Sequence, residues 1–381
     1  MEPADVLIVG AGPVGLFLAC ELRRRGHDCI VIDRASERPT HSKALAIMPG
    51  TLAMFETAGI VNRFVLSANR IDGVRFVTPR RSVYVPFGGL RPPYDFVAIL
   101  PQWRTQALLE TRLLELGCDV RYRHALVQLR QESDGNDALL ETPNGMMRIR
   151  VRYVVGCDGV RSTVREQSGI RFDGKSYPGT VLLADVRVQT AVPEHEARVH
   201  VHRGGVVTMF PMSATERRVV VISPEEPLPE RADRGRLQAR LLRAGYAETS
   251  VDEILWSNAF RVHRRLASAM RSANVFLAGD SAHTHSPVGG QGMNIGLHDA
   301  WNLAGKLSAV LAGEATETLL DRYERERLPV AKGVVRRTDM LTRALVHPHP
   351  LMRITRERIA PRVAGLSVVY GPVIRRLSLS A

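Results

Sequence analysis

The chain opens with an alternation of buried-strand and helix patterns. Val6-Leu7-Ile8-Val9 is an uninterrupted apolar run followed by glycine, which is typical of a buried strand. Residues 13–26 have helical spacing and end in three arginines and a glycine, as helix C-termini often do. Residues 29–33 form a second apolar run. Two buried strands joined by a helix predict a βαβ unit, and a parallel, doubly wound sheet follows from it.

Periodicity predicts further elements downstream. Residues 181–223 are rich in valine and carry few helix signals, which predicts an antiparallel sheet. The remaining patterns indicate helices and strands at separate places along the chain. The helices are expected at 103–116 and 317–345, and the strands at 119–131, 138–155 and 274–278.

The balance of charge bears on possible partners. A formal net charge of +13 would suit nucleic-acid binding. Only four of the 52 basic residues are lysines, however, and the arginines are spread along the chain instead of forming one block. We therefore expect no nucleic-acid partner. The excess of arginine grows at the C-terminal end, which predicts a solvated basic face there, with a peripheral membrane or acidic-partner contact as the alternative. The residues are Arg353, Arg356, Arg358, Arg362, Arg375 and Arg376.

Composition also bears on the cellular location. No window approaches the roughly 18 consecutive apolar residues of a membrane-spanning helix, and no basic segment of a signal peptide is evident. Cys20, Cys29, Cys118 and Cys157 lack metal-ligand spacing. We expect a cytoplasmic protein without stable membrane insertion and without a bound metal. Its thiols are expected to be reduced, with a redox pair as the less favoured alternative.

A glycine-rich turn, Gly10-Ala11-Gly12-Pro13-Val14-Gly15, lies between the first strand and the first helix. Glycines at this spacing permit a tight turn, close approach to a pyrophosphate and packing of helix against sheet, while the helix N-terminus faces the anion. Asp33 ends the second strand, about twenty residues further on, where a carboxylate can accept hydrogen bonds from ribose hydroxyls. This context favours a dinucleotide site over a purely structural turn.

Two later strands also end in motifs that contain glycine and aspartate. The apolar strand that ends near Gly156 is followed by Asp158-Gly159, which alone fits an ordinary turn equally well. The strand at 274–278 delivers Gly279-Asp280 at its carboxyl end, where a ligand hydroxyl could be held. Residues 287–294 then form a glycine-rich loop that opens a helix, and backbone N–H groups there can face a ligand.

Together, these motifs resemble those of the class A flavoprotein monooxygenases, the 4-hydroxybenzoate hydroxylase-like family, over nearly the whole chain. The resemblance implies an α/β fold with a Rossmann-type, glutathione reductase-like FAD-binding domain, an antiparallel β-sheet substrate domain and C-terminal helices. The FAD-binding domain is expected to be discontinuous, from residues 1–75, 100–170 and 272–345. Residues 76–99 and 171–271 would form the substrate domain, and residues 346–381 a helical tail.

The resemblance also implies which residues contact the cofactors. The glycine turn would bind the FAD pyrophosphate, Gly279-Asp280 the ribityl chain, and residues 287–294 the isoalloxazine ring. Lys43 stands where many members of the family have arginine. The full set of implied cofactor-binding residues is Gly10, Gly12, Pro13, Gly15, Asp33, Arg34, Lys43, Gln102, Arg104, Asp158, Gly159, Gly279, Asp280, Pro287, Gly292, Met293 and Asn294.

The implied activity is that of an FAD-dependent NAD(P)H:O2 monooxygenase. NADPH or NADH would reduce the flavin, O2 would add at C4a, and the hydroperoxide would hydroxylate an aromatic ring. Because the flavin does this chemistry, no catalytic side chain is assigned, and Arg218 and Pro287 are candidate flavin-side residues. Arg34 and Arg38 could meet the 2′-phosphate of NADPH or be surface charges, so the choice of reductant stays open. His202 and His263 are possible general bases, although a structural role is favoured for each.

The substrate sheet gives one hint about specificity. By resemblance, Met212 replaces the arginine that grips the carboxylate of a small benzoate, and methionine cannot form that ion pair. Met209, Phe210 and Met212 suggest a softer apolar pocket for a polyphenol, a polyketide or another secondary metabolite. The equally favoured alternative is that these three side chains belong to the core of the sheet.

Other activities fit the same scaffold. One alternative is an FAD-dependent reductase or dehydrogenase, and another is a flavin-binding protein without turnover. The expected partners of the monooxygenase are a small aromatic substrate and O2, and the expected state is a monomer or homodimer.

Overall fold

The computed structural model describes residues 4–88, 93–177, 180–202, 205–223, 228–287 and 289–346. Its first main component is a six-stranded sheet in the order β20-β21-β12-β1-β2-β8. All neighbouring strands pair in parallel except β20 and β21, which are antiparallel. The bounds are β1 (Val6–Val9), β2 (Cys29–Asp33), β8 (Val120–Tyr122), β12 (Tyr153–Gly156), β20 (Arg271–Ser272) and β21 (Val275–Leu277). The parallel sheet predicted from the βαβ pattern is therefore present.

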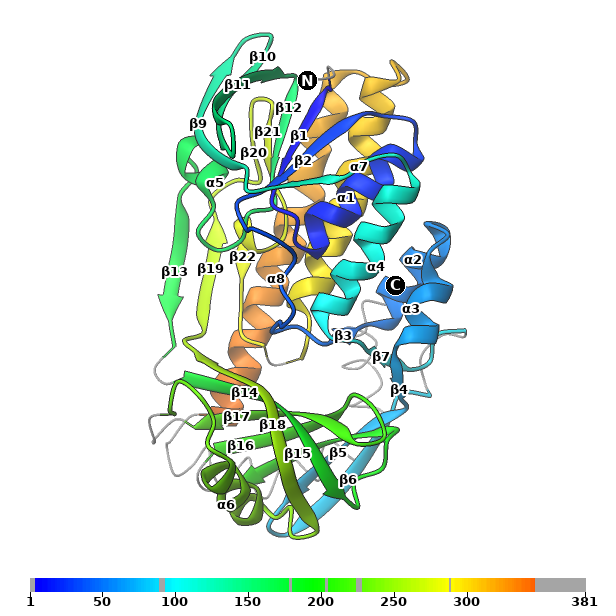
Figure 1. Cartoon of the computed structure of the whole chain (residues 1–381), viewed down its shortest axis with the longest axis vertical. Coiled ribbons are helices and arrows are strands. Elements are labelled where there is room, and N and C mark those ends of the chain that lie inside the picture. Colours follow the sequence, from blue (N-terminus) through cyan, green and yellow to red (C-terminus); the bar gives the residue numbers. More distant parts are fainter. Residues whose placement is uncertain are drawn as a thin grey trace.

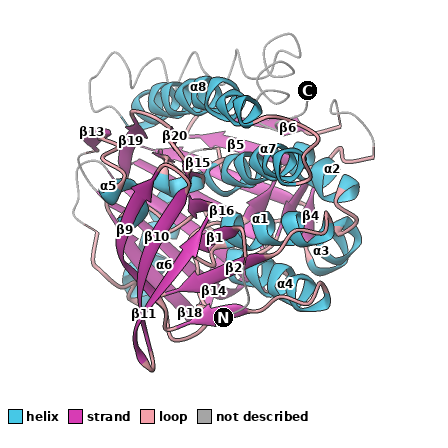
Figure 2. Ribbon diagram, turned by 90° about the horizontal axis from the view of Figure 1, so that it is seen from above, coloured by secondary structure: helices cyan, strands magenta, loops and turns pink. Residues whose placement is uncertain are grey.

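Helices cover one side of this sheet. α1 (Pro13–Arg24) packs between α4 (Gln102–Glu115) and α7 (Gly292–Leu311), and the three lie side by side in Figure 2. α8 (Asp321–Val346) follows the short helix η2 (Glu317–Leu320) and packs against α7. A small antiparallel sheet and α5 (Thr163–Gln167) adjoin β12, and the small sheet contains β9 (Ala125–Glu132), β10 (Gly135–Thr142) and β11 (Gly145–Val151). The largest apolar core forms around the central strands, because their side chains are buried on both faces.

The second main component is a seven-stranded sheet in the order β18-β14-β17-β16-β15-β5-β6. Its pairs are antiparallel, as predicted for residues 181–223, except that β15 and β5 run parallel. A parallel pair needs a long connection, and here more than a hundred residues separate β5 from β15. The bounds are β5 (Gly73–Thr78), β6 (Arg81–Pro86), β14 (Thr180–Thr190), β15 (Glu196–His202), β16 (Gly205–Pro211), β17 (Glu216–Ser223) and β18 (Thr249–Phe260).

Alternation along the strands gives the seven-stranded sheet two different faces. Val219 and Val221 of β17 pack with Leu237 and Leu241 of α6 (Arg234–Ala244) in one apolar cluster. The side chains between them in sequence, such as Val220, belong to a separate cluster on the other face. We call the first the α6 face and the second the inner face. Figure 1 shows α6 on the side of the sheet away from the six-stranded sheet.

Two groups of short elements connect the large sheets, and Figure 1 places them on opposite sides of the molecule. One group contains β3 (Ala46–Ile47), β4 (Asn69–Ile71), β7 (Val97–Ile99), α2 (Pro49–Thr57) and α3 (Val61–Ser67). The other contains β13 (Phe172–Ser176), β19 (His263–Ala267), the 3-10 turn η1 (Gly279–Ser281) and β22 (His283–Thr284).

The predicted elements can be compared with these bounds. The strand at 29–33 matches β2 to the residue, and the other predicted helices and strands agree with the structure within a few residues, with 119–131 and 138–155 each divided between strands. The predicted domain boundary between residues 75 and 76 falls inside β5. The tail predicted at 346–381, with its arginines, lies outside the described residues apart from Val346. Within the described part, no helix is long and apolar enough to cross a membrane.

Candidate active site

The three glycines of the first turn have different surroundings. Gly10 has φ +107°, and a β-carbon there would lie 2.4 Å from the Cys157 carbonyl oxygen. At Gly15 an added β-carbon would lie 2.0 Å from the Gly10 carbonyl oxygen, so this glycine permits close packing of α1. At Gly12 it would meet nothing within 4 Å. Gly12 is also the N-cap of α1, with no side-chain cap, so this end of the helix can receive a phosphate group.

Two polar side chains hold this turn in place. The Asp33 carboxylate accepts hydrogen bonds from the backbone N–H groups of Ala11 and Ala35, each at 2.8 Å. Gln106 of α4 is buried and donates from Nε2 to the Ala11 carbonyl oxygen at 3.2 Å. The sequence predicted Asp33 but gave no sign of Gln106, because only the packing of α4 against α1 brings it to the turn.

Asp158 binds the first turn of the short helix α5, whose N-cap residue is Ser162. Its Oδ2 accepts from the backbone N–H groups of Thr163 and Val164 at the start of α5, at 2.7 and 3.2 Å. Burial raises the pKa of this carboxyl, and Oδ1 has no hydrogen-bond partner among the described residues. Gly159 has φ +78°, which favours glycine in the turn. One oxygen of Asp158 therefore holds the start of α5, and the other is a buried acceptor without a partner among the described residues.

Asp280 lies at the carboxyl end of β21, as predicted. Its side chain is exposed to solvent, yet protein surrounds it closely enough to raise the pKa of its carboxyl. No described residue hydrogen-bonds to this carboxylate. Gly279 has φ +66°, and a β-carbon there would lie 2.9 Å from Val14 of α1. The glycine thus lets the turn approach the first helix, and the aspartate presents an unpaired acceptor.

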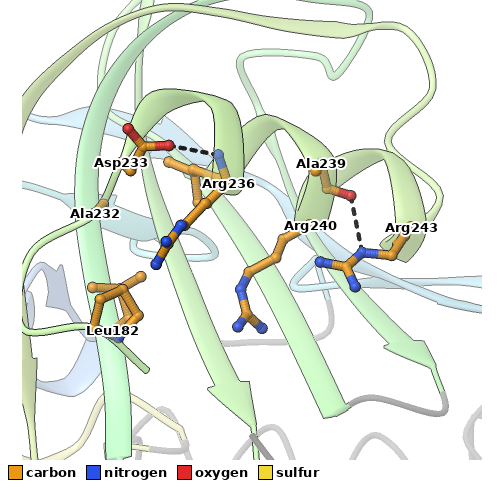
Figure 3. Close-up of a pocket in the computed structure, with 9 residues that line it drawn as sticks. Leu182, Ala232, Asp233, Arg236, Ala239, Arg240 and Arg243 are labelled. Atoms are coloured by element: carbon orange, nitrogen blue, oxygen red, sulfur yellow. Dashed lines mark hydrogen bonds between the residues drawn. The ribbon is translucent and has the colours of Figure 1, made fainter. Parts of the chain in front are cut away.

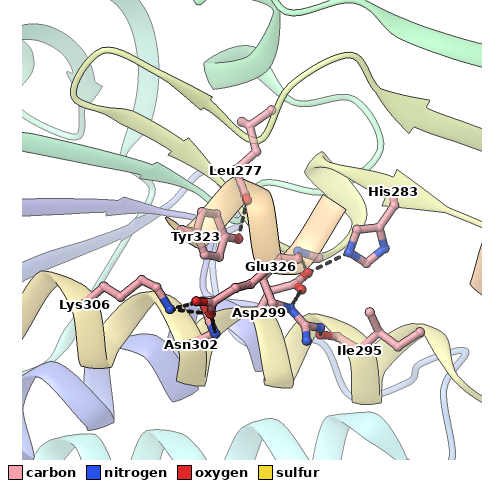
Figure 4. A network of polar contacts seen from close by, with 10 residues as sticks. Leu277, His283, Ile295, Asp299, Asn302, Lys306, Tyr323 and Glu326 are labelled. Atoms are coloured by element: carbon pink, nitrogen blue, oxygen red, sulfur yellow. Dashed lines mark hydrogen bonds and ion pairs between the residues drawn. The ribbon is translucent and has the colours of Figure 1, made fainter. Parts of the chain in front are cut away.

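A buried ionic network contacts the backbone of the Gly279-Asp280 turn and holds it in place (Figure 4). Asp299 of α7 is fully buried, and its carboxylate accepts from His283 Nε2 and Arg327 Nε, each at 2.6 Å. The same carboxylate accepts from the backbone N–H of Gly279 at 3.2 Å. Tyr323 of α8 donates to the Leu277 carbonyl oxygen at 2.7 Å. The network fixes the end of β21 to α7 and α8, and sequence reasoning did not single it out.

The N-terminus of α7 is open, and an asparagine braces it. α7 begins at Gly292 without a side-chain cap and without an acidic residue in its first turn. Asn294 is fully buried, and its side-chain amide forms three hydrogen bonds of 2.9 Å each. Its oxygen accepts from the backbone N–H of Met48, and its nitrogen donates to the carbonyl oxygens of Ala46 and Gly290. The predicted residue Asn294 therefore positions the neighbouring backbone, while the N–H groups of the first turn can face a ligand.

Arg218 connects the inner face of the sheet to the segment 41–44. Its guanidinium is 1% exposed and forms a two-point ion pair with Asp185, at 2.6 and 2.7 Å. It also donates to the Lys43 carbonyl oxygen at 2.9 Å. The Lys43 ammonium lies 4.3 Å from the ring centre of Phe260. Arg218 thus binds the backbone of Lys43, one of the residues expected to contact FAD.

The structure separates the three side chains expected to contact the substrate. Met209 is fully buried on the α6 face, where it packs in the same cluster as Leu237. Alternation along β16 turns Phe210 to the inner face, and Phe210 and Met212 are half-buried against the cluster that contains Met48. The assignment of Met209 to the substrate was therefore wrong, because it lies on the opposite side of the sheet.

Sequence reasoning missed other side chains of the inner face. Trp256 and Phe260 of β18, and Val220 and Ile222 of β17, are half-buried in one cluster there. His41 stacks on Trp256 with ring centres 5.8 Å apart. The alternation that follows Arg218 in β17 could have identified the two aliphatic side chains. The two aromatic side chains could not have been identified in this way, because only the pairing of β18 with β14 brings them to the inner face.

Several other predicted residues are exposed or are paired within the protein. Arg34, Arg104 and Pro287 are exposed, and the Arg104 guanidinium lies 5.2 Å from the Trp103 ring centre. Gln102 begins α4 and pairs through its backbone N–H with the Ala44 carbonyl oxygen at 3.0 Å. Arg38 forms an ion pair with Glu110 at 2.7 Å, so it is engaged within the protein.

A separate cavity of about 260 Å³ lies at α6 (Figure 3). Its lining includes Leu182, Asp233, Arg236, Arg240 and Arg243. None of the residues predicted to bind a cofactor or substrate lines it. This cavity is therefore distinct from the region built around the glycine turn, Asp280 and α7.

Comparisons with known proteins agree with this geometry. Residues 3–338 match the family model described as an FAD binding domain. The chain belongs to this family. It is 35% identical to an anhydrotetracycline monooxygenase of Streptomyces rimosus over 364 residues, which cover 93% of the chain and 72% of that protein. It is also 35% identical to a pentachlorophenol 4-monooxygenase of Sphingobium chlorophenolicum, over 88% of the chain and 64% of that protein.

Solved structures of this FAD-binding family have the same fold. The anhydrotetracycline hydroxylase from Streptomyces rimosus superposes with a TM-score of 0.83 and 32% identity, covering 99% of the chain and 76% of that protein. The protein is thus an FAD-dependent monooxygenase of the aromatic hydroxylase type, as the sequence motifs predicted.

The described residues fit FAD. The open space at Gly12 and the uncapped N-terminus of α1 suit a pyrophosphate. The unpaired Asp280 carboxylate suits a hydroxyl donor, and the N-terminus of α7 suits an electron-rich ring carbonyl. Bound FAD supplies the redox chemistry with NAD(P)H and O2.

Proposed function

We propose that this monooxygenase hydroxylates a phenolic ring of a polycyclic or polyphenolic compound, such as a polyketide-type secondary metabolite. The observation that supports this best is the chemistry of the inner face. Phe210, Met212, Val220, Ile222 and Trp256 present half-buried apolar surface there. Apolar and polarizable side chains favour a large aromatic ring system.

The hydrogen-bond partners of Arg218 support the same proposal. A small benzoate needs a cation that can form a two-point ion pair with its carboxylate. Arg218 lies on the inner face, but Asp185 and the Lys43 carbonyl oxygen already occupy its guanidinium. The relatives described above include one that acts on anhydrotetracycline and one that acts on pentachlorophenol, and neither name describes a benzoate.

We further propose how the chain's own residues serve the reaction. Gly10, Gly12, Gly15 and the N-terminus of α1 would hold the pyrophosphate, while Asp33 would accept from ribose hydroxyls and Asp280 from ribityl hydroxyls. Further members of the cofactor site would be Pro13, Arg34, Lys43, Gln102, Arg104, Asp158, Gly159, Gly279, Pro287, Gly292, Met293 and Asn294. The apolar inner face would exclude water from the reacting ring. Either NADPH or NADH would serve as the reductant.

Three proposals concern the organisation of the molecule. The segments 1–75, 100–170 and 272–345 would form the FAD-binding domain, with β5 as a strand shared across the boundary. The protein would be cytoplasmic, which the four unpaired cysteines support. It would act as a monomer or homodimer without a nucleic-acid partner, and light scattering on the purified protein would establish its mass.

The test of the proposed substrate class begins with the visible spectrum of the purified protein reconstituted with FAD. NADPH and NADH oxidation would then be followed with a panel of phenols, naphthols, hydroxyanthraquinones and benzoates. We expect oxidation to be stimulated by the fused-ring phenols, with a product heavier by one oxygen atom. Stimulation by small benzoates alone would refute the substrate class. Reduction of a substrate without oxygen incorporation would indicate a reductase.

A further inference from the structure

His285 follows β22 and has a defined tautomer. Its Nδ1 lies 2.9 Å from the carbonyl oxygen of Ser286. A carbonyl oxygen can only accept a hydrogen bond, so Nδ1 carries the proton. Burial lowers the pKa of the His285 imidazole to about 4, so the ring is neutral near neutral pH. Nε2 is therefore a hydrogen-bond acceptor.

This acceptor has no partner within the described protein. Nε2 of His285 is buried, and no described residue hydrogen-bonds to it. Most buried polar atoms in proteins have a hydrogen-bond partner, because leaving one without a partner is unfavourable. The partner that satisfies Nε2 must carry an O–H or N–H group.

The surroundings of Nε2 indicate where this partner lies. A β-carbon placed on Gly292, the first residue of α7, would lie 3.9 Å from Nε2. The N-terminus of α7 has no side-chain cap and no acidic residue in its first turn. The imidazole therefore stands beside backbone N–H groups that can face a ligand. A molecule that lies against this helix end would have its edge next to Nε2.

We propose that Nε2 of His285 accepts a hydrogen bond from a hydroxyl group of the ligand bound against the N-terminus of α7. The hydroxyl belongs either to the phenolic substrate or to FAD, and His285 serves as a ligand-positioning residue. The substrate version rests on the proposed function, because it requires a phenolic ring at this place. The FAD version needs only the cofactor.

A second histidine provides a matched control. His200 also has Nδ1 against a carbonyl oxygen, that of Ala244 at 2.9 Å, and also has a buried Nε2 without a partner among the described residues. Its ring stacks on Tyr246 with centres 3.9 Å apart, and Tyr246 packs in the cluster under α6. His200 thus has the same local chemistry outside the candidate site.

The test compares two substitutions at His285 with one at His200. His285→Asn retains a donor in the place of Nδ1 and removes the acceptor, whereas His285→Gln places an amide oxygen near the position of Nε2. Each variant would be titrated with FAD, and the FAD-loaded protein with 2-naphthol and 2-methoxynaphthalene. The second compound has the same rings but no hydroxyl donor, so it separates a hydrogen bond from ring contacts.

If the hydroxyl belongs to the substrate, we expect His285→Asn to weaken 2-naphthol binding about tenfold, as loss of one hydrogen bond would. Binding of FAD and of 2-methoxynaphthalene would change little, and His285→Gln would restore much of the affinity. If the hydroxyl belongs to FAD, the tenfold loss falls on FAD instead. His200→Asn should alter neither affinity.

The proposal is overturned if His285→Asn binds FAD and 2-naphthol as the wild type does. It is also overturned if His200→Asn causes the same losses, because the effect would then be general destabilisation. These titrations need no turnover. A wild-type protein that binds FAD and 2-naphthol through His285 but hydroxylates no phenol would refute the proposed function while supporting this inference.

Discussion

At the scale of single residues, Gly12 and Gly15 offer a matched pair. A methyl group at Gly12 meets open space, and φ of −69° suits alanine, whereas at Gly15 it meets the Gly10 carbonyl oxygen. We expect Gly12→Ala to fold normally but to bind FAD at least about tenfold more weakly, because the methyl group occupies the place of the pyrophosphate. Gly15→Ala should lower stability by about 1–3 kcal/mol through overpacking.

Thermal unfolding of the FAD-free protein and fluorescence titration with FAD would measure these two effects separately. Wild-type FAD affinity in Gly12→Ala would show that the pyrophosphate does not lie at this turn.

Replacing Asp280 should have opposite effects on the stability of the FAD-free protein and on its affinity for FAD. Desolvation by the surrounding protein raises the pKa of the Asp280 carboxyl, although the side chain is partly open to solvent, and no described residue hydrogen-bonds to it. A raised folded-state pKa gives a contribution to stability that is complete below the unfolded pKa and is lost as pH rises through the folded pKa. At neutral pH, Asp280→Asn should therefore leave the FAD-free protein as stable as the wild type or more stable. The same variant should bind FAD more weakly than the wild type, by a factor of about ten or more.

The pH dependence of thermal unfolding, measured without FAD, would test the sign of this effect. Asp252→Asn, on the exposed side of β18, is the control and should change neither quantity. A loss of stability in Asp280→Asn at neutral pH would contradict the expectation.

At the scale of elements, Asp299 joins α7 to α8 and to the end of β21. Burial raises the pKa of its carboxyl, but Arg327 and His283 outweigh burial and hold the pKa below its usual value. The resulting stability is present above the unfolded pKa and is lost as pH falls through the folded pKa. Asp299→Asn should cost about 3–5 kcal/mol, because it leaves Arg327 without its buried partner.

Unfolding of Asp299→Asn across an acidic pH series would test this, since the variant should lose less stability on acidification than the wild type. Asp173→Asn removes an aspartate from an exposed ion pair with Arg171 and should be nearly neutral. Equal effects of the two substitutions would rule out a structural role for the network.

At the scale of the whole molecule, the Arg218–Asp185 pair ties the seven-stranded sheet to the segment 41–44, which also pairs with the start of α4. Arg218→Met should destabilise by about 3–5 kcal/mol, because it leaves Asp185 buried without its cation. The double replacement Arg218→Met with Asp185→Leu should cost less than the sum of the single replacements, since no charge is left unpaired. Thermal unfolding of all three variants gives the coupling, and strict additivity would contradict it.

Local sequence determined much of the region proposed to bind the cofactor. The turn from Gly10 to Gly15 and the position of Asp280 depend on strand–turn–helix and strand–turn patterns, whose geometry is set by neighbours in sequence. For this reason the elements around them agree with the structure within a few residues. The same patterns were specific enough to identify the family, which the comparisons confirm.

Tertiary structure decided which side chains meet. The sequence could not tell that Met209 belongs to the α6 face and Phe210 to the inner face, because alternation separates two faces without saying which one packs on α6. Gln106, Asn294 and Asp299 act on backbone far away in sequence, through packing of α4 and α7 that no local pattern encodes. Local chemistry therefore determined the motifs proposed to bind the cofactor, whereas long-range packing of helices and strands determined the side chains that support them and the surface proposed for the substrate.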